Sequence, residues 1–575
     1  MIDLIIRNGI IVDGTGKAGF QGDVAIDKGR IIEVGKISQR AAREIDASGH
    51  AVAPGFIDVH THYDAQVFWD PKLTPSSNHG VTTVIGGNCG FSIAPLSGRP
   101  DDAAYLQAML SRVEGMPLES LQQCTTWSWT SFGEYLDRID GTLAINAGFM
   151  VGHSALRRTV MGKRAVGGKP SAEDLDAMKA LLARSLAEGG LGFSTTMSPT
   201  HNDADGAPVP SRHADASEYV ALAEVVGHAE GTFLEMVADV SRPFDEETLE
   251  RMTSMSRAAG RSLNWNLLAP NSRLPQLFDA QLAASDYAAQ RGGRIMALAA
   301  VRPISLVLTF ESGMVLDSFP GWQQVMALPH QQRKQQLADP ATRKQMQAVM
   351  HSPAAGAYAA LADWSQWRIT ETVLPENKSL NGMLIGTLAS MLNKTPLDTL
   401  LDLTVAEDLR TRFTPALTGT DDESWRMRAR SWRDPRALIG GSDAGAHLDM
   451  IDTFALSSHL LADGVRERKL MPLEDAVYRL TGLPAAIFGL KERGVVRQGN
   501  IADIVVFDPT AIGAGPIYSR ADLPGGNARL FCDAIGVKDV IVSGTPIIRD
   551  GQFTGAMPGK VLRSGRDTVT VAIAS

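Results

Sequence analysis

The chain has 575 residues, an apolar fraction of 44% and a formal net charge of −9. This length favours more than one domain, and the intermixed charges, without a basic cluster, argue against a nucleic acid partner. No run of about 18 or more apolar residues is present, so we expect no membrane span. The three cysteines are scattered and the first residues lack the pattern of a signal peptide, so we expect a cytoplasmic protein.

Both ends of the chain have the pattern of short β-strands. Residues 1–53 alternate apolar runs with turn signals such as Asn8-Gly9 and Lys28-Gly29. Residues 496–575 contain further strand-like runs, for example Val540-Ile541-Val542. From these patterns alone, the two segments either pair with each other or form unrelated β structures.

Residues 54–495 alternate apolar runs with helical stretches, which is typical of βα units around a parallel barrel. We expect eight barrel strands, near residues 56–61, 82–86, 143–151, 192–195, 232–237, 262–267, 295–301 and 437–442. A long stretch of about 305–436, between the last two strands, is predicted to be an insertion. Two interpretations of it stay open, a cover over the mouth of the barrel and a structural extension away from it.

Chemically reactive side chains fall close to the ends of these strands. The first strand leads to His60 and His62, which share one side because side chains alternate along a strand, and which can therefore reach one metal ion. Histidines that bond locally are the competing interpretation. Cys89, His153, Glu235 and Asp443 also lie at, near or just after strand ends, where barrel enzymes place their active sites.

Three sequence motifs carry a family resemblance: Pro54-Gly55-Phe56-Ile57-Asp58 with its two histidines, His79-Gly80-Val81-Thr82-Thr83, and Gly87-Asn88-Cys89-Gly90. Together they resemble the amidohydrolase superfamily and, within it, the D-aminoacylase (N-acyl-D-amino-acid deacylase) group. The resemblance extends nearly end to end. It implies a TIM-type (β/α)8 barrel with a small composite β-sandwich domain, formed by residues 1–53 and 496–575 together.

The resemblance also implies roles for individual residues. His60 and His62 match metal ligands, and Cys89 matches a thiolate ligand, which a bound metal keeps deprotonated. Asp443 matches the catalytic carboxylate that binds metal, takes a proton from the attacking water and protonates the leaving amine. A small buried cysteine and a turn aspartate are the competing interpretations of Cys89 and Asp443.

The sequence departs from the D-aminoacylase pattern at the fifth and sixth strands. That group has a histidine at the end of each, where this chain has Glu235 and the pair Asn264 and Asn266. Glu235 is a candidate oxygen ligand, with a buried, paired glutamate as the alternative. Asparagines are poor zinc ligands, so we expect one zinc ion in preference to two, held by the two histidines, Asp443 and Cys89.

A second departure concerns the substrate. The deacylases hold the substrate carboxylate with basic residues, but the matching neighbourhoods here read Leu267-Leu268-Ala269 and Leu448-Asp449-Met450. We therefore expect a small-molecule substrate that is an apolar N-acyl compound. His153, Asn266 and His201 are candidate substrate contacts, with a surface histidine as the competing interpretation of His201. A homo-oligomer is compatible with the sequence.

The predicted function is hydrolysis of a linear, non-peptide amide C–N bond by a metal-activated water, as in N-acyl-amino-acid deacylases. One alternative is a lactone or cyclic-amide hydrolase on the same scaffold. Another is a barrel that has lost its metal and serves as a binding or scaffold protein, which the two missing histidines allow. The presence of His60, His62, Cys89 and Asp443 in one chain argues against that second alternative.

Overall fold

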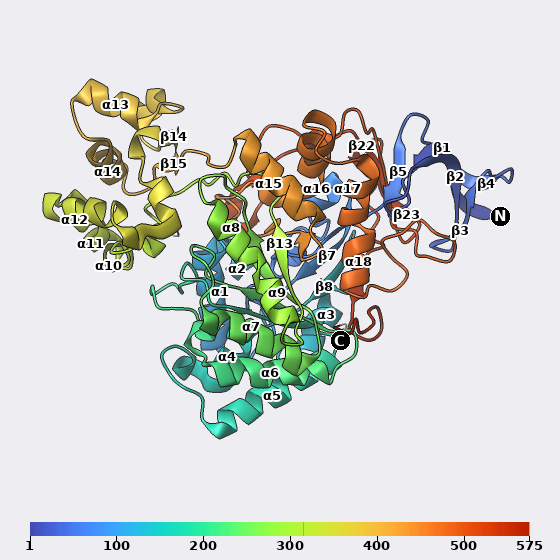
Figure 1. Ribbon diagram of the computed structural model, residues 1–575, viewed down its shortest axis with the longest axis horizontal. Coiled ribbons are helices and arrows are strands. Elements are labelled where there is room, and N and C mark those ends of the chain that lie inside the picture. The colour runs from blue at the N-terminus through green and yellow to red at the C-terminus, as the bar shows by residue number, and fades with distance from the viewer. Residues whose placement is uncertain (314, 574–575) are drawn as a thin grey trace.

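The computed structural model describes residues 1–313 and 315–573. Figure 1 shows three parts along the long axis of the molecule. A sheet that contains the N-terminus lies at one end, a barrel surrounded by helices lies in the centre, and a helical lobe lies at the other end.

The barrel has parallel strands at all eight predicted positions. These are β6 (Phe56–Asp58), β7 (Val81–Gly86), β8 (Asn146–Phe149) with β9 (Val151–Gly152), β10 (Gly192–Thr196), β11 (Phe233–Val237), β12 (Leu263–Leu268), β13 (Ile295–Ala299) and β16 (Ala437–Ile439). β8 and β9 divide the third position between them and belong to a four-stranded and a six-stranded sheet, respectively. A parallel bridge between Thr61 and Ala444 joins the first and last positions, so the two sheets form a closed barrel.

The first barrel strand is shorter than the sequence predicts. β6 ends at Asp58, so His60 and His62 follow the strand instead of lying within it. Backbone hydrogen bonds still hold this segment between its neighbours: the Thr61 N–H donates to Ile85 O at 3.0 Å, and the His62 N–H donates to Ala444 O at 2.8 Å. The two histidines therefore keep a fixed place at the C-terminal end of the barrel.

Helices cover the outside of the barrel, and local sequence signals set their ends. Two of these helices are α5 (Ala172–Ala187) and α6 (Ala216–Gly227). Ser171 and Asp174 form a capping box at the start of α5, which satisfies backbone N–H groups that lack a partner in the helix. Asp215 caps α6 in a similar way by accepting from the Glu218 N–H.

Strands from both ends of the chain form one nine-stranded sheet, in the order β24-β23-β22-β17-β5-β1-β2-β3, with β4 beside β1. Its strands are β1 (Ile2–Ile11), β2 (Phe20–Asp27), β3 (Arg30–Gly35), β4 (Ala41–Asp46), β5 (Ala51–Pro54), β17 (Ile504–Phe507), β22 (Val537–Val542), β23 (Thr545–Arg549) and β24 (Gln552–Phe553). The two ends meet where β5 pairs antiparallel with β17. Leu4, Ile6 and Val24 share a buried core with Ile504 and Ile541, so the two terminal segments pair and are not unrelated.

The end of the chain returns to the barrel. β25 (Val561–Leu562) pairs in parallel with β8, and Val561 and Leu562 are buried. The predicted segment 496–575 therefore divides between the terminal sheet and the barrel. Two residues are too few to give a periodic signal, so the sequence did not predict this strand. The domain boundaries themselves stay predictions.

The helical lobe lies between β13 and α15 (Asp422–Arg433) and is drawn in yellow in Figure 1. Its helices are α10 (Gln323–Met326), α11 (His330–Ala338), α12 (Pro340–Met350), α13 (Ile385–Leu392) and α14 (Pro396–Ala406), and its hairpin is β14 (Arg368–Glu371) with β15 (Arg412–Thr414). The lobe has a hydrophobic core of its own, which includes Trp322, Trp367 and Phe413. The predicted insertion reached to about residue 436, but α15 packs in the barrel core through Trp425 and Trp432. The lobe therefore ends before α15.

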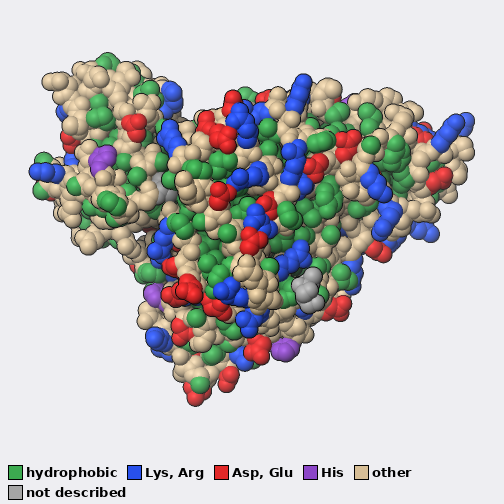
Figure 2. Space-filling view, viewed as in Figure 1, with side chains coloured by type: hydrophobic (Ala, Val, Ile, Leu, Met, Phe, Trp, Pro, Cys, Tyr) green, Lys and Arg blue, Asp and Glu red, His purple; other side chains and the backbone are tan. Residues whose placement is uncertain are grey.

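Charges of both signs are interspersed over the face shown in Figure 2. This agrees with the mixed charge of the sequence. None of the helices in the described part of the chain combines the length and the apolar composition needed to cross a bilayer.

Candidate metal centre

The structure brings His60, His62 and Cys89 together at the C-terminal end of the barrel. The Cys89 Sγ lies 3.3 Å from His60 Nε2 and 3.6 Å from His62 Nε2. Potential ligand atoms of the three residues all lie within 4.8 Å of one another, and all three side chains are buried. Such a group of two imidazoles and one thiol is suited to a zinc ion.

A tight turn after β7 places Cys89. A Cβ on Gly87 would lie 2.2 Å from Met150 O, and its φ of +71° is one that L-residues rarely adopt, so this position requires glycine. The Asn88 side chain donates to Thr61 O at 3.2 Å and to Ile85 O at 2.9 Å. The Gly87-Asn88-Cys89-Gly90 motif thus ties the thiol to the same backbone segment that carries the histidines.

Asp443 approaches the same histidines from the loop after β16. Its Oδ1 lies 3.2 Å from His60 Nε2 and 3.8 Å from His62 Nε2. The Asp443 side chain is 18% exposed, whereas the side chains of His60 and His62 are 0% and 3% exposed. The carboxylate therefore faces the accessible side of the cluster. Burial opposes ionisation of Asp443, but the hydrogen bond and charge of His60 outweigh it and hold the pKa of Asp443 below its usual value.

Glu235 lies behind the cluster and not among the converging ligand atoms. Its Oε2 accepts a hydrogen bond from the Cys89 N–H at 2.8 Å, and its Oε1 lies 3.9 Å from His60 Nδ1, the ring nitrogen that faces away from Cys89. Burial raises the pKa of Glu235 to about 7. In this position the carboxylate supports a ligand ring and a ligand backbone, and direct metal binding by Glu235 stays a prediction.

The two asparagines of β12 occupy different places. Asn266 Nδ2 lies 3.3 Å from His60 Nε2, so this amide is part of the cluster. Asn264 donates to Leu234 O at 3.1 Å on the neighbouring strand, and thus supports the barrel wall. Only Asn266 is therefore placed to touch a molecule bound at the cluster.

The predicted substrate contacts His153 and His201 lie in contrasting surroundings. His153 is fully buried, with Nδ1 2.9 Å from Thr195 Oγ1 and Nε2 2.8 Å from Glu218 Oε1. Since both ring nitrogens are engaged, the geometry gives His153 a structural place and no free group for a substrate. His201 bonds through Nδ1 to Thr196 Oγ1 at 2.8 Å, and its ring packs on Phe91 at a centroid distance of 5.0 Å. His201 is buried and is not the surface histidine of the competing interpretation.

One acidic residue of the site, Glu114, was not predicted from the sequence. Glu114 follows α1 (Pro100–Val113), is 1% exposed, and has Oε1 3.5 Å from His62 Nδ1 and Oε2 3.6 Å from His447 Nε2. It belongs to no recognisable motif. The only signal in the sequence is a glutamate at the end of an amphipathic helix, which is usually a solvent-exposed position.

The charge balance of the cluster fits a bound cation. Glu114, Glu235 and Asp443 form no ion pair with Lys or Arg among the described residues, and histidines are their only basic neighbours. His60 Nδ1, Glu114 Oε2, Glu235 Oε1 and Asn266 Oδ1 are buried without a hydrogen-bond partner. Buried carboxylates are costly unless a positive charge compensates them. A divalent ion among two imidazoles, a thiol and a carboxylate satisfies this requirement.

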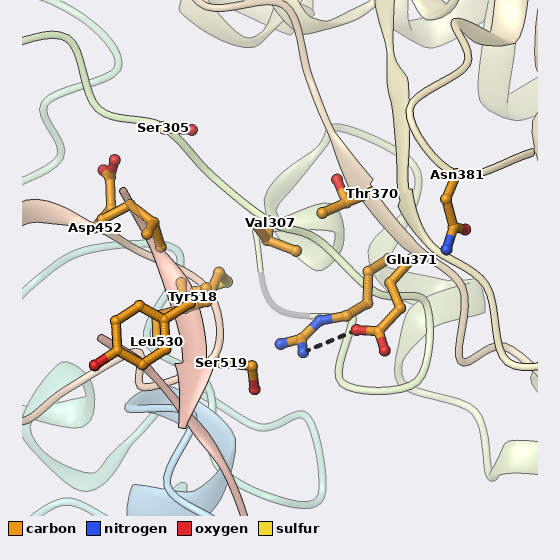
Figure 3. Close-up of a pocket in the computed structure, with 12 residues that line it drawn as sticks. Ser305, Val307, Thr370, Glu371, Asn381, Asp452, Tyr518, Ser519 and Leu530 are labelled. Atoms are coloured by element: carbon orange, nitrogen blue, oxygen red, sulfur yellow. Dashed lines mark ion pairs between the residues drawn. The ribbon is translucent and has the colours of Figure 1, made fainter. Parts of the chain in front are cut away.

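Two of the cavities outside the cluster lie next to the helical lobe: one between the lobe and the hairpin of β19 (Tyr518–Arg520) and β20 (Arg529–Phe531), the other between the lobe and the end of α1. The first, of about 540 Å³, is shown in Figure 3, where Val307, Thr370 and Glu371 face Tyr518 and Leu530 across the opening. The second, of about 590 Å³, reaches Gly115, the neighbour of Glu114. Both cavities are lined in part by Arg412 and Met450.

Fold and site together define a class of protein, because a (β/α)8 barrel with imidazole, thiol and carboxylate groups at the C-terminal ends of its strands is the arrangement of a metal-dependent hydrolase. Residues 43–548 match the model of the amidohydrolase family. The chain belongs to this family.

Relatives and solved structures match almost the whole chain. It is 33% identical to an uncharacterised protein of Mycobacterium tuberculosis (strain ATCC 25618 / H37Rv), covering 98% of this chain and 95% of the relative. It is 28% identical to a D-aminoacylase of Alcaligenes xylosoxydans xylosoxydans, covering 97% of each.

A crystal structure of D-aminoacylase aligns with a TM-score of 0.66 and 26% identity, covering 98% of this chain and 100% of that one. The N-acyl-D-glutamate deacylase of Bordetella bronchiseptica, solved with zinc and a phosphonate inhibitor, aligns with a TM-score of 0.64 and 25% identity over the same shares. The resemblance to the deacylase group inferred from the sequence motifs is confirmed.

Proposed function

We propose that this amidohydrolase cleaves the linear amide C–N bond of an N-acyl compound, in the manner of an N-acyl-amino-acid deacylase. The observation that carries the proposal is the convergence of His60, His62, Cys89 and Asp443 at the C-terminal end of the barrel. Relatives named D-aminoacylase and N-acyl-D-glutamate deacylase support the reaction class.

A zinc ion would be held by His60, His62, Cys89 and Asp443, with Asn266 beside His60. When bound, zinc supplies a Lewis acid that lowers the pKa of a water molecule and polarises the substrate carbonyl. We propose one ion in preference to two, because Glu235 and Asn266 stand where the deacylase pattern has histidines. The two strands then lack the nitrogen ligands of a second site.

Asp443 moves the proton in the proposed reaction. Its carboxylate is the most exposed group of the cluster and can accept a proton from the attacking water. The same carboxyl group then delivers this proton to the amine nitrogen as the C–N bond breaks, so the products are a carboxylic acid and a free amine. Asn266 contributes an amide group on the same side of His60, where it can orient the acyl group.

The substrate proposal concerns the outer cavity of Figure 3. Its lining is mixed: Val307, Met450, Ile517 and Leu530 offer apolar surface beside polar and charged side chains such as Glu371 and Arg412, and the loop that carries Met450 also carries Asp443. The cavity volume of about 540 Å³ has room for more than an acetyl group, so we propose that it takes a bulkier acyl group, whose apolar part would lie against the apolar residues of the wall. The apolar N-acyl substrate expected from the sequence stays a prediction.

A substrate panel tests the proposal. Zinc-loaded protein is assayed with N-acyl-D-amino acids whose acyl chains range from acetyl to long aliphatic, and with N-acyl amines that lack the carboxylate. Release of free amine from the long-chain members, absent in Asp443→Asn, supports it. Preference for N-acetyl-D-amino acids would remove the apolar-substrate proposal and leave the reaction class.

The two alternatives make different predictions in the same panel. A lactone or cyclic-amide hydrolase would open ring substrates and leave the linear amides intact. A scaffold protein would bind no metal and release no amine from any substrate. The cytoplasmic location and the oligomeric state stay predictions from the sequence.

A further inference from the structure

Glu114 joins the two sides of the metal cluster. Its carboxylate lies between His62 and His447. His62 follows the first barrel strand, and His447 belongs to the loop of residues 440–452 after the last barrel strand, called the Asp443 loop below. Its backbone oxygen also accepts a hydrogen bond from the His447 N–H. One residue at the end of α1 therefore contacts both segments that carry the ligands at the closing seam of the barrel.

The position of Glu114 has no other explanation within the described structure. The side chain is 1% exposed, and its nearest basic groups are the two imidazoles, at 3.5 and 3.6 Å. Its Oε2 has no hydrogen-bond partner. A buried carboxylate without an arginine or lysine lowers the stability of a fold, so a functional role must compensate for this cost.

The contact with His62 is on the side of the ring that the cluster does not use. His62 Nε2 faces Cys89 Sγ at 3.6 Å and Asp443 Oδ1 at 3.8 Å, whereas Nδ1 faces Glu114. A neutral imidazole carries one N–H and one lone pair. An acceptor at Nδ1 keeps the proton there, and the lone pair at Nε2 is then free for a metal.

We propose that Glu114 is a positioning residue for the metal site: its carboxylate fixes the tautomer and orientation of His62 and, through His447, ties the Asp443 loop to it. This inference rests on the proposed metal site. Glu235 has the same position relative to His60: its Oε1 lies 3.9 Å from His60 Nδ1, the ring nitrogen that faces away from Cys89. Each ligand histidine thus has a carboxylate behind it, and Glu114 is the one that also reaches the Asp443 loop.

Zinc affinity is the readout, because carboxylates behind a ligand histidine commonly contribute about 10- to 100-fold to metal affinity. Wild type and Glu114→Gln are stripped of metal, and zinc binding is measured by competition with a chromophoric chelator. We expect the dissociation constant to rise by about 10- to 100-fold in Glu114→Gln. The visible spectrum of the cobalt-loaded variant should also change, because the orientation of a ligand ring changes.

Glu218→Gln is the matched control. Glu218 is likewise 1% exposed and lies 2.8 Å from a buried histidine, His153, but it has no part in the cluster. The Glu218→Gln variant should have lower thermal stability than wild type, but the same zinc affinity and the same cobalt spectrum. If Glu114→Gln does not fold, Glu114→Asp carries the test, since it keeps the charge and withdraws the carboxylate from His62; it should weaken zinc binding in the same direction.

The outcomes separate this inference from the proposed function. If wild type binds zinc and the folded Glu114 variants match its affinity and cobalt spectrum, the positioning role is wrong while the proposed function stands. If wild type itself binds no zinc, the metal centre is wrong and the inference fails with it. Weakened binding in the Glu114 variants, with Glu218→Gln unchanged, supports both.

Discussion

The Asp443 carboxylate is more exposed than the other two acids of the site. Glu114 and Glu235 are 1% and 0% exposed and lie behind the ligand rings, whereas the Asp443 carboxylate is on the open side. Proton transfer requires contact with the reacting atoms, so this difference in exposure favours Asp443 over Glu114 and Glu235 for the proposed proton transfer.

Asp443→Asn tests this assignment. The amide keeps the shape of the side chain but cannot accept a proton from water. We expect hydrolysis of the best substrate to fall by about 100-fold or more, the range typical of general acid–base groups. Thermal unfolding followed by circular dichroism should show an intact fold. Activity within a few-fold of wild type at equal zinc content would contradict the role of Asp443.

The sequence predicted the residues that belong to short motifs and missed those that do not. The spacing of His60 and His62 and the turn around Cys89 are local signals, which survive without any knowledge of the fold. Glu114 comes to the site only because α1 ends against the loop after β16. That juxtaposition depends on packing between segments more than 300 residues apart, which no local pattern records.

At the scale of elements, the turn after β7 determines where the thiol lies. Gly87→Ala places a methyl group 2.2 Å from Met150 O at a φ of +71°. The backbone must move, and we expect zinc affinity to fall by more than 10-fold as Cys89 leaves the cluster.

Gly167→Ala is the control for this substitution. Gly167 has a similar φ of +78°, but nothing lies within 4 Å of its Cβ position. It should cost about 1 kcal/mol of stability from backbone strain alone and leave zinc affinity unchanged. Equal zinc affinities in the two variants would show that the turn does not determine the position of Cys89.

A buried histidine contacts two segments that are distant in the sequence. His79, at the end of η2 (Ser76–His79), lies 2.7 Å from Ser458 Oγ and 3.4 Å from Cys532 O. Burial lowers the pKa of His79 to about 4. The unfolded chain therefore binds more protons than the folded one between about pH 6.5 and 4, so His79 destabilises the fold as the pH falls through this window.

We expect the effect of His79 to appear as a difference in the pH dependence of the unfolding free energy between wild type and His79→Asn. The contribution of His79 between pH 7 and 4 should be about 2–3 kcal/mol. In His79→Asn the dependence of unfolding free energy on pH should be flatter by that amount, measured by urea denaturation at several pH values. Parallel curves for the two proteins would mean that His79 titrates normally in the folded state.

At the scale of the whole molecule, the helical lobe is attached to the active-site side of the barrel. Asp317 of the lobe lies 2.8 Å from Arg112 Nη2, on α1, and 3.4 Å from Asn202 Nδ2, in the loop after β10. Val307 donates its N–H to Met450 O in the Asp443 loop at 2.8 Å. These contacts attach the base of the lobe near the barrel mouth, whereas Figure 1 shows helices α10 to α14 projecting away from the barrel, so both interpretations of the insertion stay open.

Asp317→Ala should loosen this attachment. Asp317 is buried and its loss leaves Arg112 without an ion-pair partner, so we expect faster limited proteolysis within residues 302–421 and a raised KM. Asp402→Ala, which removes ion pairs to Arg343 and Lys394 inside the lobe, should leave KM as in wild type. If both variants have the wild-type KM, the lobe takes no part in substrate binding.

The sequence was informative about the barrel and the terminal sheet because most of their strands are apolar runs bounded by turns. Within the predicted insertion, the polar stretch from His330 to Met350 has a helical composition and forms α11 and α12, separated at Asp339 and Pro340. The end of the lobe and β25 were not predicted. The first depends on which core the tryptophans of α15 join, and the second on a two-residue pairing with β8.

Zinc content per chain, measured together with amide hydrolysis, tests the central claim most directly. Metal-free protein is titrated with zinc, and bound zinc and released amine are followed in parallel. The account predicts that hydrolysis appears with the first equivalent and is complete at about one zinc per chain, and that Cys89→Ala loses both. Amide hydrolysis by protein that holds no metal, or no zinc binding at all, would contradict it.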